Sequence, residues 1–253
     1  MEPGVSFAVW VTRPEEGAAR TGQALRAAGF TPQLFPLLQV DMLTPQLPED
    51  PPDVVVFVSA NAVRALGETG PVLAEARRRA RTVCVGRKTA DAAREAGWDV
   101  APLAGAERAS GMLRGMQGWQ LSQRRVWIPR GNRDGSARRE IPRFLEEAGA
   151  IVVPIDVYRV GRRKLPEAEL QALRETPPRA VLVHSPSAAT VLFRGAQARQ
   201  FRDVVARAAC VAIGPTTAAR LGELGADPIR RAARPEDSAI LAVLDQLAKE
   251  SVQ

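Results

Sequence analysis

An internal repeat constrains the fold of this 253-residue chain more than any other feature. Residues 83–90 (VCVGRKTA) correspond to residues 211–218 (VAIGPTTA), and a glycine follows each segment seven residues later. In the same chain order, residues 54–62 correspond to 181–188, and residues 9–14 to 126–131. Three such pairs indicate two related halves, and a spacing of about 120 residues is that of a small domain rather than a solenoid repeat.

Short apolar, β-branched runs alternate along the chain with stretches of helical period. The expected strands cover residues 7–12, 33–38, 54–58, 82–85, 125–129, 151–158, 180–184 and 209–213. The expected helices cover 15–28, 60–67, 71–80, 87–96, 106–116, 136–148, 166–174, 187–193, 197–207, 215–224 and 236–249. Continuously apolar strands separated by helices predict α/β architecture with parallel sheets covered on both faces.

Local signals predict where helices end and where linkers lie. Four glycines follow helical stretches and precede strands, which is typical of the left-handed residue after a helix: Gly29, Gly97, Gly149 and Gly225. Residues 41–53 carry four prolines, and residues 159–166 are rich in basic side chains. Both segments follow strand-like runs, so we interpret both as linkers.

Composition restricts the possible partners. The net charge is +7, and nearly all of the cationic residues are arginine, which suits bidentate contacts with carboxylate or phosphate. Compositional bias is the alternative, because the arginines are spread along the chain without aromatic interleaving. No apolar run reaches the length of a membrane span, and no signal peptide opens the sequence, so we expect a soluble cytoplasmic protein. One histidine and two scattered cysteines, Cys84 and Cys210, predict buried free thiols and no metal site.

Six strand-to-helix junctions are candidate anion sites, because a helix N-terminus presents unpaired backbone N–H groups. In a doubly wound sheet these junctions share the carboxyl edge, where ligands bind. Helix capping by Ser or Thr is the alternative for each junction alone, whereas six junctions on a basic chain favour an oxyanion-rich ligand. The substrate-binding candidates are Thr12, Arg13, Ser59, Ala60, Asn61, Gly86, Lys88, Thr89, Arg130, Gly131, Ser185, Ser187, Gly214, Thr216 and Thr217.

Two further side chains are candidates for the site. His184 precedes Ser185, but neighbours on a strand point to opposite faces, so we interpret His184 as a structural or ligand-edge residue rather than as the base of a Ser–His pair. The sequence has no glycine-rich nucleotide motif, no G-x-S-x-G elbow and no cluster of acid–base residues. An enzyme of this composition would act by positioning its substrate. Tyr158 ends a strand beside a linker, and its phenol is either a proton donor or a packing aromatic.

Taken together, these segments resemble the uroporphyrinogen-III synthase family over essentially the whole chain. The chain departs from the family at position 184, where members often carry threonine in a Thr-Ser-x-Ser segment. The resemblance is carried by Val11-Thr12-Arg13-Pro14, Gly29, Phe35-Pro36-Leu37, residues 57–63, Val85-Gly86 with Thr89-Ala90, Val157-Tyr158, and Ala212-Ile213-Gly214 with Thr216-Thr217-Ala218.

The resemblance implies a fold and a domain arrangement. It implies two flavodoxin-like or Rossmann-like domains with parallel sheets, joined by a two-stranded β-ribbon linker. Domain 1 would combine residues 1–37 with 166–253, domain 2 would cover 43–157, and the linkers would be 38–42 and 158–165.

The resemblance also implies a reaction. A lyase of tetrapyrrole (heme) biosynthesis would cyclise hydroxymethylbilane to uroporphyrinogen III, with inversion of the D-ring and loss of water. It would need no cofactor, and it would act as a monomer without nucleic-acid or membrane partners. Two alternatives remain open at this point: a non-catalytic module that senses tetrapyrroles or other polyanions, and a nucleic-acid-binding protein suggested by charge alone.

Overall fold

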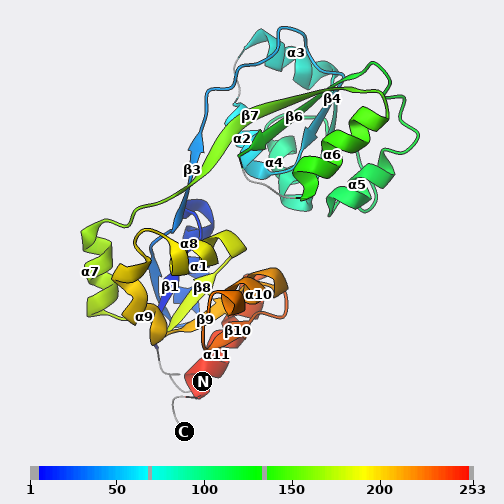
Figure 1. The fold of residues 1–253 in the computed structure, drawn as a ribbon. Coiled ribbons are helices and arrows are strands. Elements are labelled where there is room, and N and C mark those ends of the chain that lie inside the picture. Colours follow the sequence, from blue (N-terminus) through cyan, green and yellow to red (C-terminus); the bar gives the residue numbers. More distant parts are fainter. Residues whose placement is uncertain (1–5, 68–69, 133–135, 251–253) are drawn as a thin grey trace. The chain divides into compact units, whose positions relative to one another are not determined.

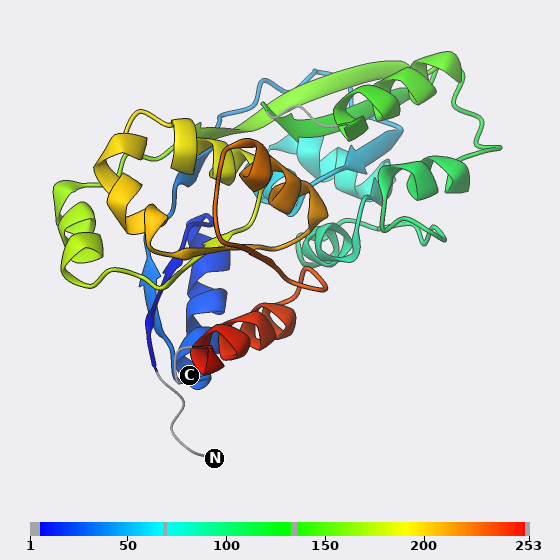
Figure 2. The same cartoon turned by 60° about the horizontal axis from the view of Figure 1, so that its bottom comes forward.

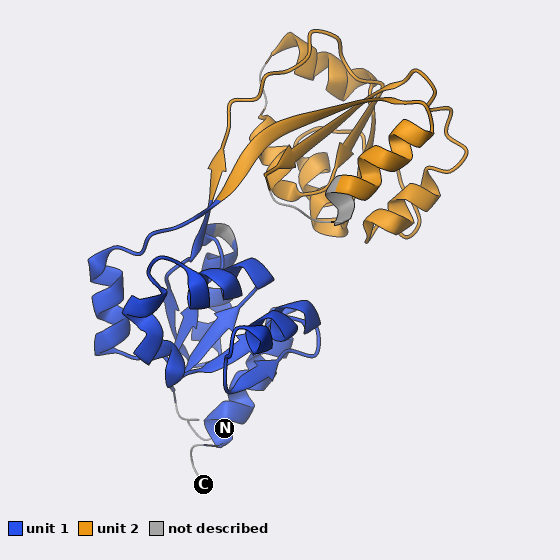
Figure 3. Ribbon diagram, in the orientation of Figure 1, with its two compact units in different colours: residues 1–39, 161–253 blue, residues 40–160 orange. Residues whose placement is uncertain are grey.

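The computed structural model describes residues 6–67, 70–132 and 136–250. The chain divides into two compact units, coloured separately in Figure 3. Unit 1 consists of Met1–Gln39 and Gly161–Gln253, and unit 2 of Val40–Val160.

Unit 1 contains a five-stranded sheet in the order β10-β9-β8-β1-β2 (Figure 1). Every neighbouring pair is parallel, as where Val9 of β1 lies opposite Ala180 of β8. The order reverses between β1 and β8, as it does in flavodoxin-type doubly wound sheets. The strands are β1 (Ala8–Val11), β2 (Thr31–Leu34), β8 (Ala180–Val183), β9 (Ala209–Ala212) and β10 (Ile229–Arg231).

Both faces of this sheet are covered. Val9 and Val11 pack on one face with apolar residues of α1 (Glu15–Ala27) and α11 (Asp237–Lys249), two helices that lie side by side in Figure 2. Trp10 points to the other face, where its ring meets that of Phe201 edge-on at 5.3 Å. Alternate strand residues thus enter two cores, which is why the strands are continuously apolar. The remaining helices of the unit are α7 (Glu167–Glu175), α8 (Pro186–Arg194), the 3₁₀ turn Ala198–Phe201, α9 (Arg202–Ala206) and α10 (Pro215–Glu223).

Unit 2 contains the sheet β3-β7-β6-β4-β5. Strands β7, β6, β4 and β5 are parallel to one another. The edge strand β3 runs antiparallel to β7, since the amide of Leu43 bonds to the carbonyl of Val157 (2.9 Å) and the amide of Arg163 to the carbonyl of Leu37 (3.0 Å). This pairing forms the two-stranded ribbon, in which both unit boundaries fall. The strands are β3 (Leu38–Met42), β4 (Val54–Phe57), β5 (Arg81–Cys84), β6 (Arg125–Gly131) and β7 (Ile151–Arg162).

The second sheet is also doubly wound. Val55 and Phe57 of β4 pack in a core with α2 (Ala60–Leu66), α3 (Pro71–Arg79) and α4 (Arg87–Glu95). Val54 and Val56, which alternate with them, pack in another core with α5 (Ala109–Gly115) and α6 (Ser136–Glu147). No described helix is both long enough and apolar enough to cross a membrane.

The sequence repeat corresponds to equivalent strands of the two sheets. Three adjacent strands correspond between the sheets: β1-β8-β9 in unit 1 and β6-β4-β5 in unit 2. The paired segments place β1 with β6, β4 with β8, and β5 with β9. Each half of the chain therefore supplies one strand of this trio to one sheet and two strands to the other, so a cut between the halves would divide both sheets.

The α/β class and most elements agree with the sequence predictions, and three local predictions were wrong. Residues 33–38 are not one strand, because β2 ends at Leu34 before Pro36, and the chain resumes pairing only at Leu38. The strand Ile229–Arg231 was missed because it has no apolar run. The helix expected over 197–207 is a 3₁₀ turn followed by a short α-helix. The four glycines expected after helices all have φ between 79° and 87°.

Candidate functional site

The structure places the predicted residues at two equivalent sheet edges. Ligands of open α/β sheets bind at the carboxyl ends of the strands, where the strand order reverses. In unit 1 this point lies between β1 and β8, which lead into Thr12-Arg13 and His184-Ser185. In unit 2 it lies between β6 and β4, which lead to Arg130-Gly131 and Ser59. The repeat makes these two edges counterparts, with Arg13 matching Arg130 and Ser59 matching Ser185.

Arg13 is held against the first helix of unit 1. Its guanidinium lies over Gly17, where any side chain would collide with it. Its Nη1 donates to Oγ1 of Thr21 (3.2 Å), and that hydroxyl donates to Oδ1 of Asp237 (3.2 Å). Arg20 pairs with the other oxygen of Asp237 at 3.2 Å. Asp237 thus contacts the guanidinium of Arg20 directly and is linked to that of Arg13 through the Thr21 hydroxyl.

Burial also affects the ionisation of Arg13. Desolvation, followed by repulsion from Arg20, lowers the pKa of Arg13, while Asp237 raises it. A partly buried guanidinium with an incompletely neutralised charge gains from an additional anion. The edge of unit 1 therefore carries a partly buried cationic group.

His184 lies in the same environment, and its imidazole is neutral. Both ring nitrogens are buried without a hydrogen-bond partner among the described residues. Burial, and then the charge of Arg13, lower the pKa of His184 to about 3. The neighbouring carbonyl of Leu182 already accepts from Oγ1 of Thr12 at 2.7 Å. The buried, neutral imidazole therefore adds no charge to this edge.

Thr12 has a structural role at this edge. Its side chain is fully buried, and its hydroxyl proton is committed to Leu182, which ties the end of β1 to β8. A hydroxyl that already donates its proton in this way is not available to donate to a ligand. The structure thus assigns the Thr12 side chain to the framework of the site.

Ser59 and Ser185 cap helices, as the alternative interpretation of the junctions anticipated. Oγ of Ser59 accepts from the amide of Asn61 (3.1 Å), and Oγ of Ser185 accepts from the amide of Ala188 (3.1 Å). Each capping serine still carries a hydroxyl proton, and the helix dipole remains. Capping therefore uses one N–H of α2 and one of α8 and leaves both helix ends electropositive.

The junctions after β5 and β9 lie one strand away from the order reversal and differ in backbone geometry. Gly86 has φ 82° and donates its amide to the carbonyl of Ala106 (2.7 Å), whereas its counterpart Gly214 is extended at φ −171°. Thr89 and Thr217 are both buried in the first turn of their helices. Four further predicted residues are half-buried or exposed at helix N-termini: Ala60, Lys88, Ser187 and Thr216.

In unit 2, Arg130 and Tyr158 both lie near the end of β6. The Nε of Arg130 pairs directly with Oδ1 of Asp156 at 2.9 Å, whereas its counterpart Arg13 is linked to Asp237 only through Thr21. Tyr158 lies opposite Gly131 in the strand register, next to an irregularity between Arg130 and Gly131. The tyrosine ring is largely buried and belongs to the core formed with α2, α3 and α4.

Sequence reasoning missed three residues of these edges. Thr21 and Asp237 join Arg13 from two different helices, and Asp156 joins Arg130 from the neighbouring strand. An acidic residue in the first turn of the expected helix 236–249 is a recognisable signal for Asp237. Its contact with Thr21 spans 216 residues, so only the tertiary structure reveals it. In the described part of the chain, His, Cys, Asp and Glu form no group of three that could hold a metal ion.

The fold defines a class of protein: a two-unit α/β protein with a doubly wound sheet in each unit. Residues 19–242 match the family described as uroporphyrinogen-III synthase HemD. A relative from Methanothermobacter thermautotrophicus that carries this family's name is 32% identical over 230 residues, covering 85% of this chain and 88% of the relative. The chain belongs to the uroporphyrinogen-III synthase family, a family of enzymes that act on a tetrapyrrole.

Solved structures support the fold independently. The chain resembles the crystal structure of uroporphyrinogen-III synthetase from Helicobacter pylori with a TM-score of 0.67 at 21% identity, covering 96% of this chain and all of that one. A mutant uroporphyrinogen III synthase from Thermus thermophilus gives a TM-score of 0.57 at 21% identity, with the same coverage.

Proposed function

We propose that this protein catalyses the cyclisation of hydroxymethylbilane to uroporphyrinogen III, as a lyase that eliminates water and inverts the D-ring. The observation that supports it best is a pair of equivalent strand-end sites, each with an arginine beside an electropositive helix end, in a chain of this family. The substrate carries eight carboxylates, and arginines and helix N-termini are the groups that bind carboxylates.

The chemistry requires little acid–base assistance. The substrate hydroxyl leaves as water when it gains a proton, and the electron pair of the pyrrole nitrogen displaces it to form an azafulvene. The D-ring then attacks through a spiro intermediate before the macrocycle closes. Tyr158 is our candidate for the proton donor, because a phenol hydroxyl can donate a proton. The main contribution of the protein is to hold one folded conformer, because the free substrate closes without inversion.

Binding is distributed over several groups in this proposal. The substrate-binding set comprises the fifteen junction residues named from the sequence together with His184, with Thr12 acting through the framework. Arg13 and Arg130 supply charge, and the neutral His184 supplies a hydrogen bond. We further propose that the enzyme acts as a monomer in the cytoplasm, without a cofactor and without a nucleic-acid partner.

Product analysis tests the proposal. The purified chain is incubated with hydroxymethylbilane, the products are oxidised, and the I and III isomers are separated by chromatography. We expect mainly the III isomer, against the I isomer in a reaction without protein. Tight binding of the substrate with only the I isomer formed would instead identify a tetrapyrrole-sensing module and contradict catalysis.

A further inference from the structure

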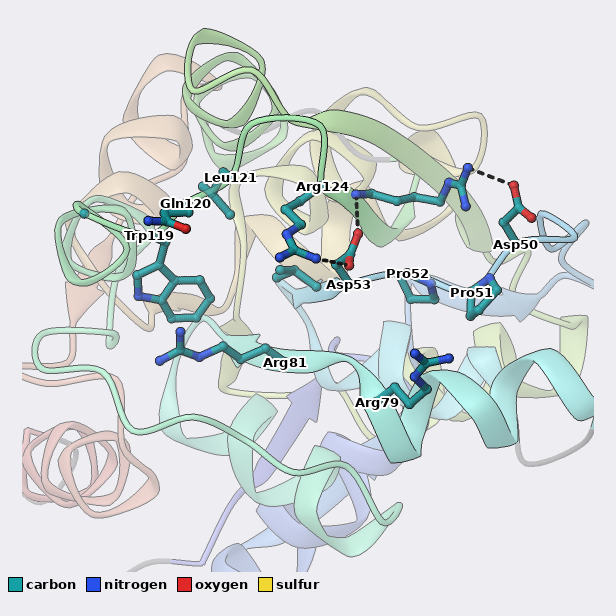
Figure 4. Close-up of a pocket in the computed structure, with 13 residues that line it drawn as sticks. Asp50, Pro51, Pro52, Asp53, Arg79, Arg81, Trp119, Gln120, Leu121 and Arg124 are labelled. Atoms are coloured by element: carbon teal, nitrogen blue, oxygen red, sulfur yellow. Dashed lines mark hydrogen bonds and ion pairs between the residues drawn. The ribbon is translucent and has the colours of Figure 1, made fainter.

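A concave site lies at the edge of the unit 2 sheet that is opposite the carboxyl ends of its strands. A pocket of about 920 Å³ opens where β4, β5 and β6 begin, and all of its lining residues belong to unit 2 (Figure 4). Its size is within the range of small-molecule sites. The candidate substrate residues lie at the carboxyl ends of the strands, so this pocket is separate from them.

The pocket is cationic. Four arginines line it, Arg79, Arg81, Arg124 and Arg125, against two aspartates, Asp50 and Asp53. The four positive and two negative charges leave a formal excess of two positive charges. Arginine is the side chain best suited to bind phosphate or carboxylate through two parallel hydrogen bonds.

The two aspartates orient two of the arginines. Oδ1 of Asp53 accepts from Nη1 of Arg124 (2.8 Å), its Oδ2 accepts from the backbone amide of Arg125 (2.8 Å), and Asp50 pairs with the guanidinium of Arg125 (2.8 Å). Desolvation raises the pKa of Asp53, but the bonds from Arg125 and Arg124 outweigh it and hold that pKa below its ordinary value. Asp53 is therefore ionised at neutral pH. The guanidinium groups of Arg124 and Arg125 each use part of their N–H donors on an aspartate and keep the others for a ligand.

Arg81 differs from its neighbours in having an aromatic partner. Its guanidinium lies 3.7 Å from the centre of the Trp119 ring, and Figure 4 shows it beneath the indole. It has no carboxylate partner among the described residues, and it is exposed. A guanidinium stacked on an indole on one side can stack on a second planar ring on the other. Arg81 thus offers an unneutralised charge and a flat surface at the same place.

We propose that this pocket binds an aromatic polyanion, a planar ring that carries phosphate or carboxylate groups. The ring stacks on the Arg81–Trp119 pair, and the anionic groups contact the oriented guanidinium groups of Arg124 and Arg125. Arg79 has a simpler explanation than ligand binding, because it ends α3, pairs with Glu75 and lies where a helix C-terminus favours a solvated cation. That explanation does not apply to Arg81, which stacks on an indole and has no carboxylate partner among the described residues. The proposal does not depend on the cyclisation activity.

NMR of the indole N–H groups tests the proposal on the full chain. Trp10, Trp98 and Trp127 are buried, and Trp119 is the partly exposed tryptophan, so its signal reports on the pocket and is assigned with Trp119→Phe. Four probes separate the contribution of the ring from that of the anionic groups. ATP combines a ring with phosphates, and benzenehexacarboxylate combines a ring with carboxylates. Tripolyphosphate has phosphates but no ring, and adenosine has a ring but no charge. We expect the Trp119 signal to shift with ATP, with benzenehexacarboxylate or with both. Which of the two binds more tightly identifies phosphate or carboxylate as the natural group.

Two matched variants locate the effect. Arg81→Gln should weaken binding of the ring-bearing anion by about 10-fold or more, the loss expected for a charge-assisted contact. Arg114→Gln removes the same charge from an exposed position of α5 outside the pocket and should leave the affinity within about 2-fold, since exposed charges interact weakly. Turnover of hydroxymethylbilane should remain at the wild-type level in Arg81→Gln. Three results would overturn the proposal: no shift with any probe, tripolyphosphate binding as tightly as the ring compounds, or an equal loss in both variants.

Discussion

The ring of Tyr158 lies directly against the α-carbon of Gly131, so that a Cβ at position 131 would overlap three ring carbons of the tyrosine. Gly131 does not have a positive φ, so the requirement for glycine is one of space and not of backbone conformation. The position of the only tyrosine in the chain thus depends on a missing side chain on the adjacent strand.

Gly131→Ala should displace the Tyr158 ring and destabilise the protein. We expect a loss of about 1–3 kcal/mol in the free energy of unfolding, the usual cost of overpacking, measured by urea denaturation. Gly214→Ala is the control, because Gly214 is extended and a methyl group added there would meet no atom within 4 Å. Equal effects of the two substitutions would show that the contact with Tyr158 carries no stability.

Tyr158→Phe tests the proposed proton donor. The ring packs in the core, so phenylalanine should keep the fold, and the substrate is already primed to lose its hydroxyl. We expect turnover to fall by about 10- to 100-fold, the low end of general acid catalysis, with mainly the III isomer still formed. Wild-type rates in the folded variant would leave Tyr158 as a packing residue.

His184 should make stability depend on pH. Its pKa is about 3 in the folded chain and 6.5 as the ordinary value. Between pH 6.5 and pH 3 the unfolded chain binds one more proton than the folded chain. The contribution of the neutral His184 to the free energy of unfolding is therefore complete above pH 6.5 and is lost as the pH falls toward 3. As the pH falls through this range, we expect the free energy of unfolding to decrease by about 1.4 kcal/mol per pH unit more than it does in His184→Thr. Urea denaturation at several pH values measures this difference.

The same histidine gives a direct spectroscopic check, because it is the only one in the chain. The Hε1 resonance of the untagged protein should not titrate between about pH 8 and pH 5, a range in which an ordinary histidine changes its charge. A midpoint near the ordinary value would mean that the ring is not buried as described. Bound substrate carboxylates should raise this pKa, since an adjacent negative charge favours the imidazolium.

Thr12→Val should lower stability more than it alters substrate affinity. The substitution keeps the shape of the side chain but removes the hydroxyl that bonds to Leu182 at 2.7 Å. Because the site is fully buried, we expect a cost of about 1–3 kcal/mol in unfolding free energy. Thr216→Val is the control, since Thr216 is exposed at the start of α10. A folded variant of normal stability with a strongly raised KM would instead place the Thr12 hydroxyl on the substrate.

Some features of this protein were predictable from local sequence. Val54, Val55 and Val56 are consecutive and apolar, which indicates a strand buried on both faces, and the structure confirms it. Ser59 and Ser185 precede helices and cap them, because a cap needs only atoms two or three residues away. The repeat similarly predicted two related α/β parts, since each strand–helix unit carries its own pattern of apolar residues.

Sequence alone determined the α/β class, most of the elements in their chain order, and which residues follow the strand ends. Only the tertiary structure decided that Asp237 meets Thr21 and Arg13, that Gly131 accommodates Tyr158, and that Arg81 stacks on Trp119. Helix and strand patterns are encoded within a few neighbouring residues, whereas these contacts join segments whose distance along the chain carries no local signal. The charge of Arg13 and the neutrality of His184 depend on burial and on partners that the fold assembles.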